Sequence, residues 1–390
     1  MDQEIINMMA LTCIHPLNAV NAHLLLDAAG SATELMSNRQ NLRQVIPDIN
    51  EKIVEAFRHA DDALRTAEEE FDFASKKNIQ CISINDEAYP QLLSQCPDAP
   101  LVLYYLGNAP LNPRHCISVV GTRHSTDYGR DICKHFLAEL TKYFPDTLVV
   151  SGLAYGIDVN AHRAALDCGL PTVGVLAHGL DMIYPSVHRH TAVKMIHQGG
   201  LLTEYMSKTK IDKGNFVRRN RIVAGISQAT IVVESAAKGG SLITADLAVE
   251  YNREVCAFPG NIFNQYSEGC NKLIANHQAH LITSVDDFVA AVGWTKPEPE
   301  SAAFIPQQQE LFPQLSIEQQ QIYAALDNKD SKSINQIVIE TNLPLSKVSA
   351  ILLDMELDGL VTSLGGSRYK KTFIKVGSKN SVFSFPTQCI

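Results

Sequence analysis

Residues 116–158 read CISVVGTRHSTDYGRDICKHFLAELTKYFPDTLVVSGLAYGID, and this stretch decides the fold. A short apolar run at 116–120 meets a loop that begins with glycine and leads into a helical pattern. A second apolar run follows at 147–150. Short, almost entirely apolar runs are typical of strands whose sheet is covered by helices on both faces. The order strand, helix, strand therefore predicts a parallel sheet with helical crossovers.

The same alternation continues along the chain to about residue 282. Helical patterns separate most of the further apolar runs, which are short and rich in β-branched residues. Strands are expected at 172–176, 201–203, 230–233, 254–257 and 280–282. We therefore predict an α/β fold for residues 81–294, with a Rossmann-like, doubly wound and mostly parallel sheet.

Different patterns flank this sheet on both sides. Residues 1–80 alternate apolar helical stretches with polar breaks, which predicts a small N-terminal helical domain. Residues 295–315 are rich in Pro, Gln and Glu without a period, as in a linker. Residues 316–375 follow the order of a C-terminal winged helix, with a Gly-Gly turn in the wing. A tail at 376–390 completes the expected organisation.

Composition narrows the class of protein. The nine cysteines are scattered and form no C-x-x-C pair, so neither a disulfide framework nor a thiolate zinc site is expected. The first residues are acidic where a signal peptide needs basic ones, and no apolar run approaches a membrane span of about 18 residues. We therefore expect a cytoplasmic protein without a membrane partner.

Positive charge is concentrated in one segment of an acidic chain. The formal net charge is −9, which by itself disfavours a partner as acidic as nucleic acid. Residues 208–221, however, read KTKIDKGNFVRRNR and carry six cations against one acid. Phe216 lies among these cations, and an aromatic between cations suits a single strand whose base stacks while its phosphates are paired. Contact with about four phosphates predicts a log K against log salt slope near −3.

Three loops that follow strands have the character of anion sites. They contain Gly121-Thr122-Arg123, the segment 151–158 and the segment 234–241, each leading into a helix. Ligands of an open parallel sheet bind beyond the carboxyl ends of its strands, and helix N-termini attract anions. None of the loops has the G-x-G-x-x-G or G-x-x-x-x-G-K-[ST] pattern, so a dinucleotide or ATP cofactor is not expected.

Structural explanations for the same residues stay open. Asp158 could cap its own helix while the glycines around it only make a turn. The basic segment could be a solvated helix whose Phe216 faces the core. His162, His188 and His190 have no third ligand at a characteristic spacing, so no metal site is expected.

Seven short motifs occur in one order between about residues 85 and 285. They are VVGTR (119–123), SGLAYGID (151–158) with Ala161-His162, GLDMIYP (179–185), GNFVRRNRI (214–222), ESAAKGGSLITA (234–245), FPGNI (258–262) and GCNKLI (269–274). Together they resemble the DNA-processing protein DprA family, also called Smf, of bacterial natural transformation. An ordered set of this size is more specific than any single glycine pattern.

The resemblance implies a Rossmann-like fold, binding of single-stranded DNA without sequence preference, and no catalytic cycle or cofactor. It also implies homodimers and loading of the recombinase RecA onto incoming strands. Carried onto the matching positions, the residues expected at the DNA are Gly121, Thr122, Arg123, Ser151, Gly152, Lys213, Asn215, Phe216, Arg218, Arg219, Arg221, Gly239, Gly240 and Ser241.

The resemblance is weaker at both ends of the chain. In some family members the N-terminal helices resemble a sterile-alpha-motif or helix-hairpin-helix unit, but residues 16–24 lack the Gly-x-Gly hairpin that grips a DNA backbone. The expected recognition helix of the winged helix carries Lys347 but also Asp354, Glu356 and Asp358, which complements a charged duplex poorly. A protein-contact or regulatory role is the prediction for that domain.

Two other classes of function remain as alternatives. The Gly-Gly-Ser segment before a helix also resembles the loop of Rossmann-type nucleotide phosphoribohydrolases, in which case Glu234 or Glu204 would be the catalytic acid. The arginine and the Glu-rich signature of that family are not reproduced here. A winged-helix transcription regulator is the third class, and a palindrome-specific duplex footprint would support it.

Overall fold

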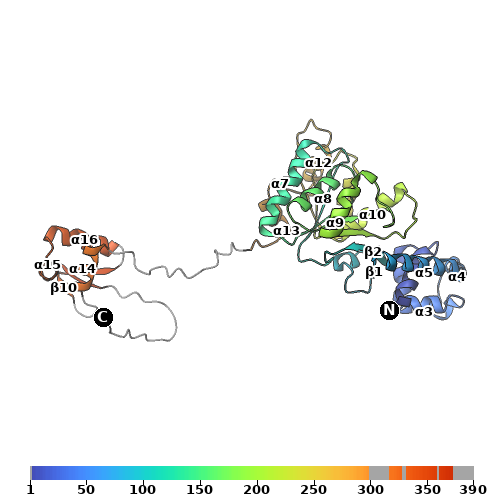
Figure 1. Ribbon diagram of the computed structural model, residues 1–390, viewed down its shortest axis with the longest axis horizontal. Coiled ribbons are helices and arrows are strands. Elements are labelled where there is room, and N and C mark those ends of the chain that lie inside the picture. Colours follow the sequence, from blue (N-terminus) through green and yellow to red (C-terminus); the bar gives the residue numbers. More distant parts are fainter. Residues whose placement is uncertain (1, 298–315, 327–330, 358–359, 372–390) are drawn as a thin grey trace. The chain divides into compact units, whose positions relative to one another are not determined.

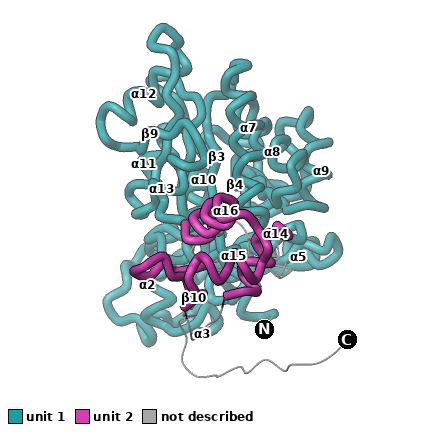
Figure 2. The backbone as a smooth tube through the Cα atoms, turned by 90° about the vertical axis from the view of Figure 1, so that its left-hand side faces the viewer, with its two compact units in different colours: residues 1–297 teal, residues 298–390 magenta. Residues whose placement is uncertain are grey.

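The computed structural model describes residues 2–297, 316–326, 331–357 and 360–371 (Figure 1). The chain divides into two compact units, residues 1–297 and 298–390, which Figure 2 colours separately. Most of the expected linker at 295–315 and the whole expected tail at 376–390 lie outside the described residues.

One nine-stranded sheet forms the centre of the first unit. Its strand order is β1-β2-β6-β5-β4-β3-β7-β8-β9, and every pair from β6 to β9 is parallel. The strands are β1 (Gln80–Ser83), β2 (Val102–Gly107), β3 (Cys116–Val120), β4 (Leu148–Ser151), β5 (Thr172–Val175), β6 (Gly199–Thr203), β7 (Ala229–Val232), β8 (Glu254–Ala257) and β9 (His280–Leu281). The predicted doubly wound, mostly parallel α/β fold is therefore confirmed.

Helices cover both faces of this sheet (Figure 1). One buried core joins the sheet to α10 and α11, and another joins it to α7, α8 and α13. The strands alternate their apolar side chains between these two cores, which is why their runs contain so few polar residues. The helices are α6 (Gln91–Ser94), α7 (Asp127–Tyr143), α8 (Ile157–Asp167), α9 (Arg189–Gln198), α10 (Lys213–Gly225), α11 (Gly240–Glu250), α12 (Glu268–Ala275) and α13 (Val285–Val292).

The strand order reverses beside β3. From β3 the chain moves through β4 and β5 to β6 on one side, and then returns to place β7 and β8 on the other. At such a reversal the loops after neighbouring strands lead away from each other and leave a crevice at the carboxyl edge of the sheet. The loops after β3, β4 and β7 therefore surround the expected ligand position.

The N-terminal helices share a core with one edge of the sheet. They are α1 (Asp2–Cys13), α2 (Ala19–Ala29), α3 (Ala32–Ser37), α4 (Glu51–Arg58) and α5 (Asp61–Lys76). Met8, Leu35 and Phe57 are buried in one cluster with Val102 and Tyr104 of β2. Because β1 and β2 run antiparallel beside β6, they extend the parallel sheet and provide the surface on which these helices pack.

The second unit has the predicted winged-helix organisation. Its elements are α14 (Ile317–Ala325), β10 (Lys332–Ser333), α15 (Ile334–Thr341), α16 (Leu345–Leu357), β11 (Val361–Leu364) and β12 (Arg368–Lys371), with sheet order β10-β12-β11. Two of its cations are engaged within the unit, because Lys347 of α16 pairs with Glu318 and the Arg368 guanidinium of the wing donates to Ser331.

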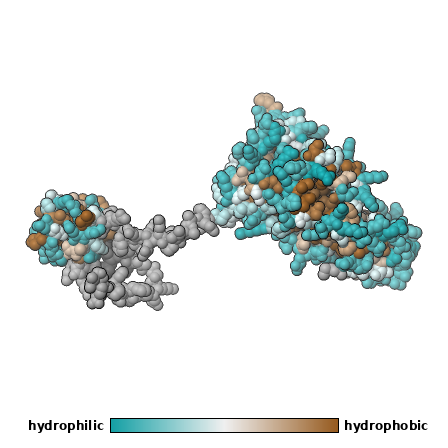
Figure 3. All heavy atoms as spheres, in the orientation of Figure 1, coloured by the Kyte–Doolittle hydropathy of each residue, from teal (hydrophilic) through white to brown (hydrophobic). Residues whose placement is uncertain are grey.

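The surface of the first unit is largely hydrophilic, with an apolar patch near α9 and α10 and an apolar tip beyond α12 (Figure 3). Among the described residues, no helix combines the length and apolar character needed to cross a membrane.

Candidate nucleic-acid interface

Backbone hydrogen bonds join the loops after β3, β4 and β7. The Thr122 N–H donates to the Glu234 carbonyl (2.7 Å), and the Ile157 N–H donates to the Thr122 carbonyl (3.1 Å). A Cβ atom at Gly121 would lie 2.5 Å from a side-chain atom of Ile157 and 2.8 Å from the Glu234 carbonyl oxygen. Glycine is therefore required at 121 for the loops to approach this closely.

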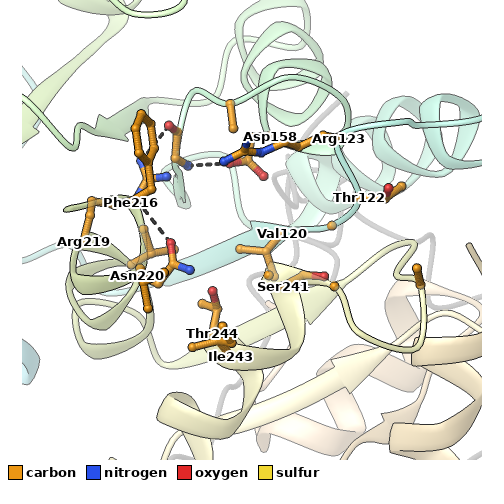
Figure 4. A pocket seen from close by; sticks show the side chains of 18 residues that line it. Val120, Thr122, Arg123, Asp158, Phe216, Arg219, Asn220, Ser241, Ile243 and Thr244 are labelled. Carbon is orange, nitrogen blue, oxygen red and sulfur yellow. Dashed lines mark hydrogen bonds between the residues drawn. The ribbon is translucent and has the colours of Figure 1, made fainter. Parts of the chain in front are cut away.

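A cavity of about 290 Å³ opens between these loops and the start of α10 (Figure 4). It lies at the carboxyl edge of the sheet, where the strand order reverses. Its lining residues include Gly121, Thr122, Arg123, Gly152, Ala154, Asp158, Phe216, Arg219, Asn220, Ala236, Gly239, Gly240, Ser241 and Thr244.

Arg123 and Phe216 meet at this cavity. The guanidinium carbon of Arg123 lies 5.7 Å from the centre of the Phe216 ring, within the range of a cation–π contact. The Tyr184 ring approaches the same Phe216 ring edge-on, with 5.8 Å between centres. Arg123 is itself exposed, so its charge is available to a ligand. Arg123, Phe216 and Tyr184 thus bring one cation and two aromatic rings together.

Arg219 forms part of the cavity wall but is buried. Its Nη1 group donates to the Gly152 carbonyl at 2.6 Å and to the Val175 carbonyl, and its Nε donates to Asn220 at 3.3 Å. A side chain at Gly152 would collide with this guanidinium. The backbone of Gly152 is thus shaped around a fixed positive charge.

Asp158 lies close to the same charge. Its carboxylate accepts from the Gly152 N–H at 3.2 Å. Burial raises the pKa of this carboxyl, while Arg219 and the backbone N–H groups of Ala154 and Gly152 act in the opposite direction. Burial likewise lowers the pKa of Arg219, and Asp158 opposes that change. The two charges compensate each other inside the wall, so the exposed Arg123 is the cation best placed to attract an anion.

Arg221 does not reach this cavity. It is buried on another side of α10, where its Nη2 group forms an ion pair with Glu204. Together with the exposed Arg218, it lines a separate cavity of about 570 Å³ beside the N-terminal helices. The cationic segment expected to follow one DNA strand is thus divided between two sides of one helix.

Of the other expected residues, only the three at the start of α11 line the cavity, and Ser151, Lys213 and Asn215 do not. Gly239, Gly240 and Ser241 line it where α11 begins. Ser151 is completely buried below it and donates to the Val119 carbonyl at 2.6 Å. Lys213 is exposed at the first turn of α10, and Asn215 lies in that turn with its side chain donating to Lys210 at 3.5 Å.

A sequence profile of the family described as DNA recombination-mediator protein A matches residues 80–293. The chain belongs to the DprA family. A profile described as the DprA winged helix domain matches residues 306–367. The DprA assignment therefore covers the sheet with its cavity and the C-terminal unit.

Individual DprA and Smf proteins show the same relationship. Protein Smf of Synechocystis sp. is 34% identical over 332 residues, which cover 76% of this chain and 81% of that protein. A putative DNA processing protein DprA of Mycobacterium tuberculosis is 37% identical over 280 residues, covering 70% of this chain and 69% of that protein. The X-ray structure of DprA from Streptococcus pneumoniae superimposes with a TM-score of 0.64 at 31% identity, and the match covers 73% of this chain and 97% of that chain.

Sequence reasoning missed several cavity residues of this DprA-family chain. Asn220 and Val223 lie on the same side of α10 as Phe216, and Thr244 follows Ser241 by one turn of α11. The helical spacing of three and four residues could have indicated them. Tyr184 had no such signal, because it reaches Phe216 only through the folding of the loop after β5.

Two of the three histidines considered for metal binding, His162 and His188, have structural partners. His162 is fully buried, with Nδ1 2.7 Å from the Thr172 hydroxyl, and burial lowers its pKa to about 3. His188 Nδ1 lies 2.9 Å from the Leu153 carbonyl. Within the described part of the chain, no three His, Cys, Asp or Glu side chains come together as a metal site.

Proposed function

We propose that this DprA-family chain binds single-stranded DNA at the cavity between β3, β4, β7 and α10 and catalyses no reaction there. The observation that carries the proposal is the position of Arg123 over the Phe216 ring, at the mouth of a cavity lined by glycines. A guanidinium can pair with a phosphate while the neighbouring ring stacks on an unpaired base. A duplex keeps its bases paired and so offers no free base to the ring.

The backbone around the cavity suits a phosphate. Residues 239–241 line the cavity where α11 begins, and the N–H groups of a helix start attract anions. A Cβ at Gly240 would meet no atom within 4 Å, so the chain is open to a ligand at that point. Arg219 holds the backbone of this wall in place by donating to the Gly152 carbonyl, and its own charge is balanced by Asp158.

The number of exposed cations changes the expected salt dependence. Arg123, Lys213 and Lys238 are exposed, whereas Arg219 and Arg221 are buried and Arg218 lines the other cavity. Three phosphate contacts correspond to a log K against log salt slope of about −2 on a single strand. This value replaces the slope near −3 that the sequence suggested, because buried cations release no counterions from DNA.

Glu234 and Glu204, the candidate catalytic acids of the phosphoribohydrolase alternative, have other partners in the structure. The Glu234 carboxylate accepts from the Thr126 N–H (2.9 Å) and hydroxyl (2.6 Å) at the start of α7, and Glu204 is ion-paired with Arg221. Neither carboxylate lines the cavity beside Arg123. Incubation with nucleoside monophosphates should therefore release no free base, and measurable release would contradict the non-catalytic proposal.

The proposal extends to partners that the family resemblance implies. The bound strand would be protected and passed to RecA in the cytoplasm during natural transformation, by a homodimer of this chain. Sedimentation of the purified chain tests self-association. Assembly of RecA on single strands, followed through its ATP hydrolysis with and without the chain, tests the transfer.

The decisive experiment is a titration of fluorescent single-stranded and double-stranded oligonucleotides at several salt concentrations. We expect tighter binding of the single strand, no dependence on its sequence, and a slope of about −2. Preference for a palindromic duplex would instead favour a transcription regulator built on the winged helix. Absence of single-strand binding at low salt would refute the proposal.

A further inference from the structure

In the described part of the chain, the exposed aromatic rings follow the carboxyl ends of strands. Among the described Phe, Tyr and Trp residues, four are exposed: Tyr128, Tyr155, Tyr184 and Phe263. Tyr155 follows β4, Tyr184 follows β5, Tyr128 opens α7 after β3, and Phe263 follows β8. No exposed ring among these residues lies at the opposite edge, so the distribution needs a reason specific to this edge.

Phe263 is the most exposed of the four. Its residue surface is 90% accessible, and its neighbour Ile262 is 80% accessible. Exposing a large ring to water costs free energy that burial of the same ring would recover. A ring in this position is suited to a partner rather than to the core.

Hydrogen bonds hold the loop of Phe263 in a defined shape. The Phe263 N–H donates to the Asn261 side chain at 2.9 Å, and the Gly260 N–H donates to Asn271 at 3.1 Å. The Tyr128 hydroxyl donates to the Pro259 carbonyl, which ties this loop to the start of α7. The exposed ring is therefore presented by an ordered turn.

A hydrogen bond and a ring contact connect this loop to the cavity at Arg123. The Ser235 N–H, in the loop after β7, donates to the Tyr266 carbonyl at 2.6 Å. The Tyr266 ring stacks on His124 with 6.1 Å between centres. His124 follows Arg123, whose guanidinium lies over Phe216. The rings and the cavity thus belong to one continuous edge.

Cations lie between the rings along the same edge. Arg123 follows β3, and the exposed Lys238 lies in the loop after β7, the strand between β3 and β8. Rings interspersed with cations suit the bases and phosphates of a single strand, and stacking tolerates any base. A protein partner would not require both kinds of group along one edge.

We infer that Tyr184 after β5, Phe216 of α10, Tyr155 after β4, Tyr128 after β3 and Phe263 after β8 form one aromatic row. This row carries a single strand across the sheet from the Arg123 cavity to the β8 loop. This inference rests on the proposed function and extends it to residues outside the cavity. Adjacent strands are about 4.8 Å apart, so the path from β5 to β8 spans about 19 Å. At the 3.4 Å rise of a stacked strand this is about six nucleotides.

A tryptophan reporter tests the far end of the row directly. The chain contains one tryptophan, Trp294, which packs against His115 (4.4 Å between ring centres) and Phe144 (5.1 Å). In Phe263→Trp, saturation with an oligonucleotide of about 12 nucleotides should quench a large part of the added fluorescence, whereas the unsubstituted chain should change little. Unchanged emission from Phe263→Trp, at concentrations where it demonstrably binds that oligonucleotide, would overturn the inference.

Oligonucleotide length gives a second and independent readout. Phe263→Ala should weaken binding of the oligonucleotide of about 12 nucleotides by roughly five- to 160-fold, as expected for the loss of one stacked base. Binding of an oligonucleotide of about three nucleotides, which fills only the cavity, should not change. Val249→Ala is the matched control, because Val249 is an exposed apolar residue in the last turn of α11, away from this edge.

The outcomes separate this inference from the proposed function. If the unsubstituted chain binds neither length, the proposed function fails. If it binds both lengths and Phe263→Ala binds the longer one equally well, the proposed function stands and the aromatic row is wrong. A change in sedimentation of Phe263→Ala with unchanged DNA affinity would assign Phe263 to a contact between copies of the chain and would also overturn the inference.

Discussion

The guanidinium carbon of Arg123 lies 5.7 Å from the centre of the Phe216 ring, although the two residues come from the loop after β3 and from α10. The contact holds a cation and a flat apolar surface at one opening, and these are the two features that a single strand uses. The contributions of charge and of stacking to DNA affinity can be measured separately, because either residue can be changed without removing the other.

Reversal of the exposed charge should abolish retention of DNA. Arg123→Glu or Lys213→Glu replaces an exposed cation with an anion, so each should leave the fold intact and weaken single-strand binding strongly at moderate salt. Arg123→Ala should reduce the magnitude of the salt slope by about 0.7. Lys142→Glu is the control, because it changes the net charge equally at an exposed position in the last turn of α7, and its affinity should change little. Unchanged affinity of Arg123→Glu would contradict the site.

Loss of the ring should act differently from loss of charge. Phe216→Ala removes a stacking surface but no charge, so affinity should fall by roughly five- to 160-fold while the salt slope stays the same. Phe216→Trp should retain most of the affinity. A change in slope equal to that of Arg123→Ala would show that Phe216 acts only by positioning the guanidinium, and would argue against base stacking.

The buried pair of Arg221 and Glu204 should contribute to stability. Arg221→Met leaves a carboxylate buried without its partner, which costs about 3–5 kcal/mol of the free energy of unfolding. Adding Glu204→Leu should recover much of that loss, because the double variant leaves neither charge unpaired. Denaturant unfolding measures both changes. If Arg221→Met is as stable as the unsubstituted chain but binds DNA weakly, Arg221 belongs to the interface instead.

Acidification should destabilise the chain through His162. Burial lowers the pKa of His162 to about 3, below the ordinary value of 6.5, so the unfolded chain binds more protons between these two pH values. The free energy of unfolding should therefore fall as the pH drops through this window, by up to about 1.4 kcal/mol per pH unit from this group. His162→Asn should show a shallower dependence in denaturant unfolding between about pH 4.5 and 6.5. Identical slopes would show that His162 is not the responsible group.

Local patterns determined most of the sheet. All seven strands expected from the sequence occur, because most of them are short, buried apolar runs that follow a helical pattern. Strands β1 and β2 were not expected. The run QCIS at β1 is short and partly polar, and both strands pair antiparallel at the edge, so no crossover helix marks them. Their pairing depends on β6, which lies far along the chain.

Helix boundaries with strong capping residues were equally accessible to sequence analysis. Gly30 ends α2 with φ of 83°, and the Ser31 hydroxyl caps α3 by accepting from the Glu34 N–H. In contrast, the shared core of the N-terminal helices with β2 crosses the boundary expected at residue 80. Capping is a contact between neighbours in sequence, whereas a shared core joins segments far apart.

The sequence by itself determined which loops meet at the carboxyl edge, because the alternation of strands and helices dictates the direction of every parallel strand. It also placed Arg123, Gly121 and the Gly239-Gly240 pair in those loops. Only the tertiary structure decided which cations of α10 are buried and paired and which are exposed. Both sides of that helix are covered, so neighbouring arginines contact different groups. Arg219 faces carbonyl groups at the cavity, and Arg221 faces Glu204. The sequence shows how many cations a segment carries. Carbonyl and carboxylate groups from other segments determine which of these cations remain available to bind an anion.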